Sequence, residues 1–228
     1  MTRNSCFSHA FTLIELIVVL AIIAILMSMV YPVYTGISER AKATKDLSNL
    51  RQIGLATQTY LNDTDGILPG SSIPPVTWMS QLSPKYFSGW RGFQSPFDKR
   101  PSSEVGGASS PISYGVNANI YPGGAAIAAS KITKPTAFIL FAPAQASGAT
   151  VSFSGWANSP LSGVTVAGNG NNTATSNPGG VAIGGAQNNR QRINALFADL
   201  HCETMPWATF TRTGATTDDP DAPLRWNP

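Results

Sequence analysis

The sequence predicts an α+β protein in which one long N-terminal helix packs on a small antiparallel sheet within a loop-rich head. Three observations support this fold class. An almost wholly apolar run near the N-terminus passes into an amphipathic stretch with helical spacing. Beyond residue 63, short segments rich in β-branched and aromatic residues predict strands. The 21 Gly and 17 Pro residues among 228 predict many loops between them.

The apolar run extends from Phe11 to Val30 and contains Glu15 as its only charge. It has the length of about 20 residues that a transmembrane helix needs, whereas the apolar region of a secretory signal has about 7–15. No small-x-small cleavage site lies between the run and the segment VYPVYTG. We therefore predict a transmembrane helix over residues 11–33. Basic residues on both sides leave its orientation open on charge alone.

The position of Glu15 raises a physical question, because a carboxylate within lipid is costly unless it is paired. Two interpretations are open. Glu15 lies near the membrane interface, where it is hydrated or protonated, or it pairs with a cation at the same depth. An amino terminus created by cleavage before Phe11 would be such a cation.

The segment AFTLIELIVVLAIIAIL resembles the N-terminus of type IV prepilins and type II secretion pseudopilins. In that family, a short polar leader and a small residue precede Phe-Thr-Leu-Ile-Glu and a long apolar helix. The resemblance covers residues 8–32 and implies a pilin-like fold with a leader over residues 1–10. It also implies cleavage by prepilin peptidase between Ala10 and Phe11, followed by methylation of the Phe11 amine. One departure is Ala10, since the family usually has Gly before the cut.

The same resemblance implies how the subunits would assemble. Glu15 corresponds to the family's conserved acid, and Pro32 lies where family members carry a helix-kinking proline. The apolar helices of such subunits form a central bundle, in which Glu15 of one subunit would face the Phe11 ammonium of its neighbour. Because desolvation offsets much of the attraction, the pair would mainly fix the position of the subunit rather than add net stability.

The sequence after the run predicts an amphipathic continuation of the helix over residues 34–62. Its apolar stripe has a three- to four-residue spacing and comprises Ala43, Leu47, Leu50, Gly54, Thr57 and Leu61. Lys42 and Asp46 are predicted to form an i,i+4 pair on its surface. The helix is predicted to end at the segment NDTDG, where Asn, Asp and Gly favour a turn.

Two acidic stretches are candidate metal sites. Asp63-x-Asp65-Gly66 resembles the opening of a calcium loop, but the later ligands are absent, so a turn that ends the helix is favoured. A second candidate is the acidic stretch near the C-terminus, comprising Asp218, Asp219 and Asp221. A solvated tail is the favoured interpretation there. We therefore expect no cofactor, with calcium at these aspartates as the alternative.

The head, residues 63–228, is predicted to contain a short helix at TWMSQLSP and strands at ISYGVNANI and TAFILFAPA, the second of them central. The segment RINALFADLHCETM predicts a hairpin with a turn near Asp199 and Leu200. A flexible loop is predicted near residues 162–190, which are rich in Gly, Asn, Ser and Thr.

Scattered head segments resemble an enlarged prepilin-type family with a His-x9-Asp-Gly marker. The counterparts here are DGILP, Trp78, SYGVN and INALFADLHCE. Asn189 replaces the histidine of that marker, so any role of that histidine is absent here. Leu200 replaces the glycine, which predicts a less tight turn because Leu disfavours positive φ.

The sequence gives little support for catalysis. It has no Gly-x-Ser-x-Gly elbow, P-loop or dinucleotide motif. Removal of the leader would leave His201 as the only histidine and Cys202 as the only cysteine. Asp199, His201 and Glu203 alternate and could share one strand face, for which a solvated polar surface is the favoured interpretation. We therefore expect a protein that is not an enzyme.

These observations predict a structural subunit of a pseudopilus for type II protein secretion. It would be a single-pass protein of the bacterial inner membrane with its head periplasmic or extracytoplasmic. Its partners would be copies of itself, other pseudopilins, prepilin peptidase, the inner-membrane assembly platform and lipid. A scattered net charge of +3 does not indicate nucleic acid. Two alternatives are a minor type IV pilin or surface adhesin that binds a ligand, and a membrane-anchored periplasmic enzyme.

Overall fold

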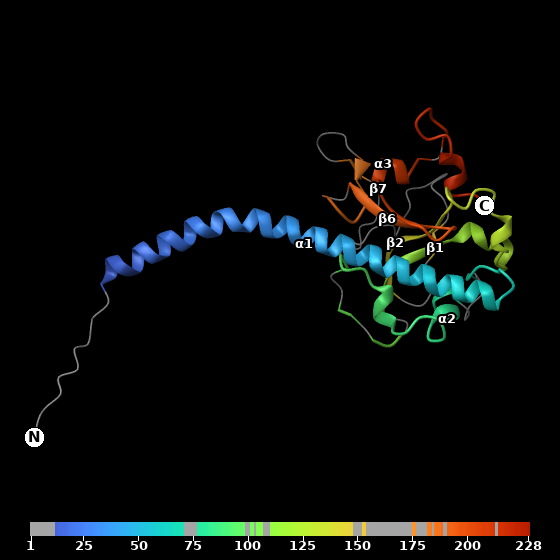
Figure 1. Ribbon diagram of the computed structural model, residues 1–228, viewed down its shortest axis with the longest axis horizontal. Coiled ribbons are helices and arrows are strands. Elements are labelled where there is room, and N and C mark those ends of the chain that lie inside the picture. The colour runs from blue at the N-terminus through green and yellow to red at the C-terminus, as the bar shows by residue number, and fades with distance from the viewer. Residues whose placement is uncertain are drawn as a thin grey trace, which may run out of the picture. The chain divides into compact units, whose positions relative to one another are not determined.

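The computed structural model describes residues 12–70, 77–98, 101–102, 104–106, 110–147, 152–153, 175–176, 182–183, 185–188, 191–212 and 214–228. The chain divides into two compact units, Met1–Ala41 and Lys42–Pro228. The long helix α1, Leu13–Asp63, contributes residues to both units. The α+β fold predicted from the sequence is confirmed (Figure 1).

Helix α1 begins with a reciprocal capping box. The Thr12 hydroxyl accepts a hydrogen bond from the Glu15 backbone N–H at 3.3 Å, and the Glu15 carboxylate accepts one from the Thr12 N–H at 2.9 Å. This arrangement satisfies two of the backbone donors that a helix start leaves without partners. The helix is continuous through Pro32. It ends at Asp63, after which Gly66, at φ 78°, donates its N–H to the Leu61 carbonyl.

The head contains a five-stranded sheet of order β3-β1-β2-β6-β7. Its strands are β1 Pro111–Asn117, β2 Ile139–Ser147, β3 Ser152–Phe153, β6 Arg192–Phe197 and β7 Cys202–Pro206. The pairs β1–β2, β2–β6 and β6–β7 are antiparallel, and β3 pairs with β1 in parallel. The predicted strands and the central place of β2 are confirmed. Two short helices lie between α1 and β1: α2 Trp78–Leu82 and η1 Trp90–Phe93. Three more connect β1 to β2: η2 Ala118–Ile120, η3 Pro122–Gly124 and η4 Ala129–Lys131.

Two hydrophobic clusters lie on the two faces of the sheet. On one face, Leu50, Ile53 and Ala56 of α1 pack with aromatic and aliphatic side chains of the sheet and of α2. Gly54 permits the close approach, because a Cβ there would lie 3.1 Å from Cδ1 of Leu196. The other face is covered by α3, Trp207–Phe210, and by the C-terminal segment with η5, Ala222–Arg225 (Figure 1).

The turn between β6 and β7 corrects one prediction. Leu200 adopts φ 69° and donates its N–H to the Phe197 carbonyl at 2.9 Å, while the Phe197 N–H donates to the His201 carbonyl at 3.0 Å. This is a tight three-residue hairpin loop with Leu at the left-handed position, so the predicted loosening is wrong. The Asp199 carboxylate supports the turn by accepting the His201 N–H. Leu200 also packs against the core beneath α1.

Most of the predicted loop near residues 162–190 lies outside the described residues. Within it, β4 Thr175–Ser176 and β5 Ala182–Ile183 form a two-stranded antiparallel sheet. The structure therefore adds a short two-stranded sheet to a segment for which no strand was predicted.

Candidate functional site: the N-terminal segment and the polar junction of the head

The first part of α1 exposes an apolar surface. Between Leu13 and Ile37, its large hydrophobic side chains are 46 to 75% exposed. An 18-residue window of this helix has a mean hydropathy of 3.0, and none of it is buried. By length and composition this helix is able to cross a membrane. Such a surface is stable only when lipid or other apolar helices cover it.

The Glu15 carboxylate uses one of its two oxygens to cap its own helix. Oε2 accepts hydrogen bonds from the Thr12 N–H at 2.9 Å and from the Thr12 hydroxyl at 2.7 Å. No described residue donates to Oε1. The box therefore holds the carboxylate in a fixed orientation and leaves one oxygen for a donor from another molecule. The predicted processing residues Ala10 and Phe11 lie outside the described residues.

This helix follows a recognisable sequence motif. Residues 7–31 match the prokaryotic N-terminal methylation motif. The match includes Ala10, Phe11 and Glu15, and it supports a processed protein of the type IV pilin-like or pseudopilin class. With the apolar helix, it indicates a membrane-anchored protein. No curated protein and no solved structure matches the chain.

Within the head, a buried carboxylate joins α1 to the sheet. Asp46 is fully buried and accepts hydrogen bonds from the Ser95 hydroxyl, from the Tyr114 hydroxyl at 2.7 Å and from Asn194 Nδ2 at 2.7 Å. The predicted surface pair of Lys42 and Asp46 is therefore wrong. Burial raises the pKa of Asp46, and the three hydrogen bonds oppose this rise because they favour the charged form.

The hydrogen bonds of Asp46 extend into a wider network, which we call the polar junction. It comprises Ala43, Asp46, Asn49, Ser95, Tyr114, Asn194 and Thr204. Asn194 Nδ2 also contacts the Ala43 carbonyl at 3.2 Å, and its Oδ1 accepts from the Thr204 hydroxyl at 2.6 Å. The junction thus connects α1 with β1, β6, β7 and the segment after η1. A buried charge is tolerated only when such partners surround it.

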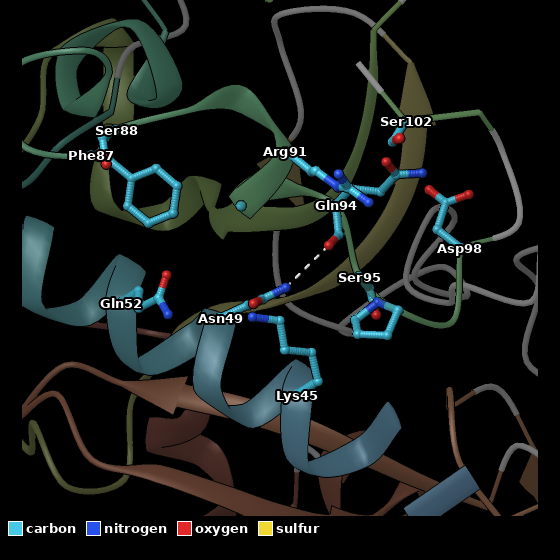
Figure 2. Close-up of a pocket in the computed structure, with 12 residues that line it drawn as sticks. Lys45, Asn49, Gln52, Phe87, Ser88, Arg91, Gln94, Ser95, Asp98 and Ser102 are labelled. Atoms are coloured by element: carbon cyan, nitrogen blue, oxygen red, sulfur yellow. Dashed lines mark hydrogen bonds between the residues drawn. The ribbon is translucent and has the colours of Figure 1, made fainter. Parts of the chain in front are cut away.

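A groove of about 670 Å³ lies directly beside the polar junction (Figure 2). Lys45, Asn49 and Gln52 line it from α1, and described residues between Phe87 and Ser102 line the facing wall. Asn49 spans the two walls, because its Nδ2 donates to the Gln94 carbonyl at 3.1 Å. Ser95 takes part in both features, since it lines the groove and donates to Asp46. No local pattern in the sequence predicts this groove, because its walls come from distant segments.

One of the two candidate calcium ligands at the end of α1, Asp63, has protein partners. Asp63 accepts from Lys85 Nζ at 2.9 Å and from the Tyr86 hydroxyl at 2.8 Å. These hydrogen bonds lower the pKa of Asp63, and the bond from Lys85 has the largest effect. Asp65 adopts φ 51° in the turn that ends the helix. The positive φ angles of Asp65 and Gly66 are those of a turn that ends the helix, as predicted for this segment.

Two of the three C-terminal aspartates, Asp219 and Asp221, have protein partners and are not part of a solvated tail, whereas Asp218 is exposed. Both oxygens of Asp219 accept hydrogen bonds from Arg225 Nη2, at 3.1 and 3.0 Å, and Arg212 adds a third contact at 3.3 Å. Asp221 pairs with Lys134. The prediction failed because these partners could not be recognised from local pattern. Among the described residues, no group of three His, Cys, Asp or Glu side chains is placed to hold a metal ion.

The residues considered for catalysis lie at the β6–β7 turn. His201 Nδ1 contacts the Asp199 carboxylate, and its ring stacks on Phe197 with centroids 4.2 Å apart. Asp199 lies in the turn rather than on β7, so the expected single strand face is not formed. Burial, aided by the charges of Asp199 and Asp46 and opposed by Arg51, raises the pKa of Cys202 to about 11.

Proposed function

We propose that this chain is a structural subunit of a pseudopilus that serves type II protein secretion. The observation that carries the proposal is the methylation motif at residues 7–31, which continues into a helix whose apolar side chains are exposed. In this proposal, prepilin peptidase cuts between Ala10 and Phe11 and the new amine is methylated. The helix anchors the subunit in the bacterial inner membrane, and the head lies on the extracytoplasmic side.

The capping box supports a specific mode of assembly. In the proposed filament, the Phe11 ammonium of one subunit donates to Oε1 of Glu15 in its neighbour, while Oε2 stays bound to Thr12. Opposite charges attract more strongly in an apolar bundle than in water. A misplaced subunit would leave a carboxylate without a cation, and this penalty is larger than the net stability that a correctly placed pair adds. The pair would therefore select the correct position of each added subunit.

A mechanical rather than a catalytic role is part of the same proposal. The polar junction fixes the second half of α1 to three strands, which suits a subunit that is moved by its helix. The chemistry of the remaining candidate nucleophile also supports it. With a pKa of about 11, the Cys202 thiol is almost wholly protonated at neutral pH and is therefore a poor nucleophile.

Processing is tested by the intact mass and N-terminal sequence of the protein extracted from membranes. We expect a chain that starts at N-methylated Phe11. A chain that starts at Met1 would contradict the proposal, because Glu15 would then have no Phe11 amine to meet. A strain that lacks the gene should fail to export secreted proteins. Normal export combined with loss of surface adhesion would instead favour the pilin or adhesin alternative.

The charge pair is tested by two substitutions with different effects on the cap. Glu15→Gln retains an acceptor for the capping box but removes the charge, so processed subunits should accumulate in the membrane without forming filaments. Thr12→Val removes the side-chain part of the box and retains the charge, so it should reduce assembly less. Normal filaments from Glu15→Gln would show that the carboxylate acts only as a helix cap.

A further inference from the structure

The groove between α1 and the segment after α2 is lined by groups that match one kind of ligand. We propose that it binds an acidic peptide segment, with carboxylate side chains held by Lys45 and Arg91 and with the peptide backbone held by the amide side chains between them. This proposal does not depend on the role of the N-terminal helix in assembly. It assigns a binding role to the head itself.

The two cations stand on opposite walls of the groove. Lys45 lies on α1, and Arg91 lies on η1 across from it (Figure 2). Lys45 forms no ion pair with any described residue. Arg91 Nη1 lies 3.3 Å from Glu104 Oε1, but the two side chains are 68 and 70% exposed. Exposed pairs of this kind are weak, so an incoming carboxylate can replace Glu104.

The remaining lining favours a peptide over a simple polyanion. Asn49, Gln52 and Gln94 each carry an amide that both donates and accepts hydrogen bonds. A peptide backbone offers N–H donors and carbonyl acceptors to such amides, whereas an inorganic anion offers acceptors only. The volume of about 670 Å³ also exceeds what a single inorganic ion would fill and lies within the range of pockets that hold organic ligands.

The aromatic residue of the groove argues against a carbohydrate. The Phe87 ring stacks on Phe93 with centroids 4.6 Å apart. Gly92 approaches the same ring so closely that a Cβ on Gly92 would lie 2.4 Å from it. Phe87 is only 6% exposed. It therefore offers no open face on which a sugar could stack, and it serves as apolar support for the wall that carries Arg91.

The floor of the groove is built from buried polar side chains. Asn49, Ser95 and Asp98 are 5, 2 and 9% exposed. Asn49 and Ser95 are held by Gln94 and by the polar junction, and Asp98 accepts from the Ser113 hydroxyl at 2.7 Å. These bonds fix the floor before any ligand arrives, which lowers the entropy lost on binding. Asp98 places a carboxylate in this floor, so the carboxylates of the peptide are expected at Lys45 and Arg91 on the walls rather than at the floor.

The test uses the full chain in detergent micelles and a fluorescein-labelled hexaglutamate peptide, with binding followed by fluorescence anisotropy. Hexaglutamine is the neutral control. We expect hexaglutamate to bind and hexaglutamine to bind at least tenfold more weakly. The Kd for hexaglutamate should rise as salt is increased, because exposed charges are screened. Equal binding of both peptides, or no binding of hexaglutamate at millimolar concentration, would overturn the proposal.

Four variants locate the binding site. Lys45→Gln and Arg91→Gln should each raise the Kd about two- to fivefold, as expected for exposed ion pairs. Glu104→Gln should lower the Kd, because it releases Arg91, and damage to the fold cannot produce this gain. Lys131→Gln, which removes an exposed cation of η4 outside the groove, should leave the Kd unchanged. An equal loss in Lys131→Gln would show that binding reflects net charge alone and would overturn the proposal.

A final arm separates the peptide from a small polycarboxylate. Citrate is added as a competitor at concentrations matched in charge to hexaglutamate. We expect citrate to compete at least tenfold less well, because it lacks the backbone groups that the amides bind. Competition by citrate as effective as that of the peptide would overturn the assignment to a peptide.

Discussion

Removal of the Tyr114 hydroxyl tests the polar junction most directly. Tyr114 is fully buried and donates one of the three hydrogen bonds that Asp46 accepts. Tyr114→Phe keeps the ring, so it creates no large cavity, but it leaves the buried carboxylate with two donors. A hydrogen bond to a charged group contributes about 1.5–3 kcal/mol, so we expect the free energy of unfolding to fall by about 2 kcal/mol at neutral pH.

The assay is urea unfolding of the full chain in detergent micelles, followed by tryptophan fluorescence. All five tryptophans lie in the head, so the signal reports on the head alone. Tyr86→Phe is a matched control, because the Tyr86 hydroxyl also donates to an aspartate, Asp63, but at an exposed position. We expect it to cost no more than about 0.5 kcal/mol. Equal costs for the two variants would refute the reasoning that burial makes the junction important.

Three further predictions concern pH dependence, packing and thiol reactivity. Burial raises the pKa of Asp46 above its unfolded value. The stability that protonated Asp46 contributes should therefore be lost as the pH rises from about 4 through the raised pKa. Unfolding curves of Asp46→Asn, measured at several pH values, should lack this loss. Gly54→Val should lower the free energy of unfolding by about 1–3 kcal/mol through overpacking against the sheet, whereas Gly36→Val, where nothing lies within 4 Å, should not change head unfolding. In the Cys6→Ser variant, native Cys202 should react with iodoacetamide at pH 8 about 100-fold more slowly than a thiol of pKa 9.0; an equal rate would contradict the buried thiol.

Periodic patterns predicted much of the fold. The hairpin of β6 and β7 and the central strand β2 were predictable because their apolar residues follow strand spacing and are bounded by turn residues. The second half of α1 was predictable from an apolar spacing of three to four residues, and its first half was predictable from the length of its apolar run. The capping box could also have been found, since Thr12 and Glu15 match the Thr-x-x-Glu pattern at the helix start.

The features that sequence reasoning missed depend on contacts between distant segments. Asp46 was assigned to the surface because it is charged, although it lies three and four residues before the buried Asn49 and Leu50 and therefore on the buried face. Leu200 was expected to loosen its turn, but the Asp199 carboxylate and packing beneath α1 hold its positive φ. The aspartates near the C-terminus have partners that only the fold brings close.

The polar junction also determines where α1 can lie along the sheet. A slide of the helix by one turn, about 5.4 Å, would bring either Leu50 or Lys42 to the place of Asp46. Leu50 would leave the hydroxyls of Ser95 and Tyr114 without an acceptor, and Lys42 would direct a cation at them. Either displacement costs several hydrogen bonds at once. The hydrogen bonds of the polar junction therefore resist a pull along the helix axis, so the head moves together with the helix.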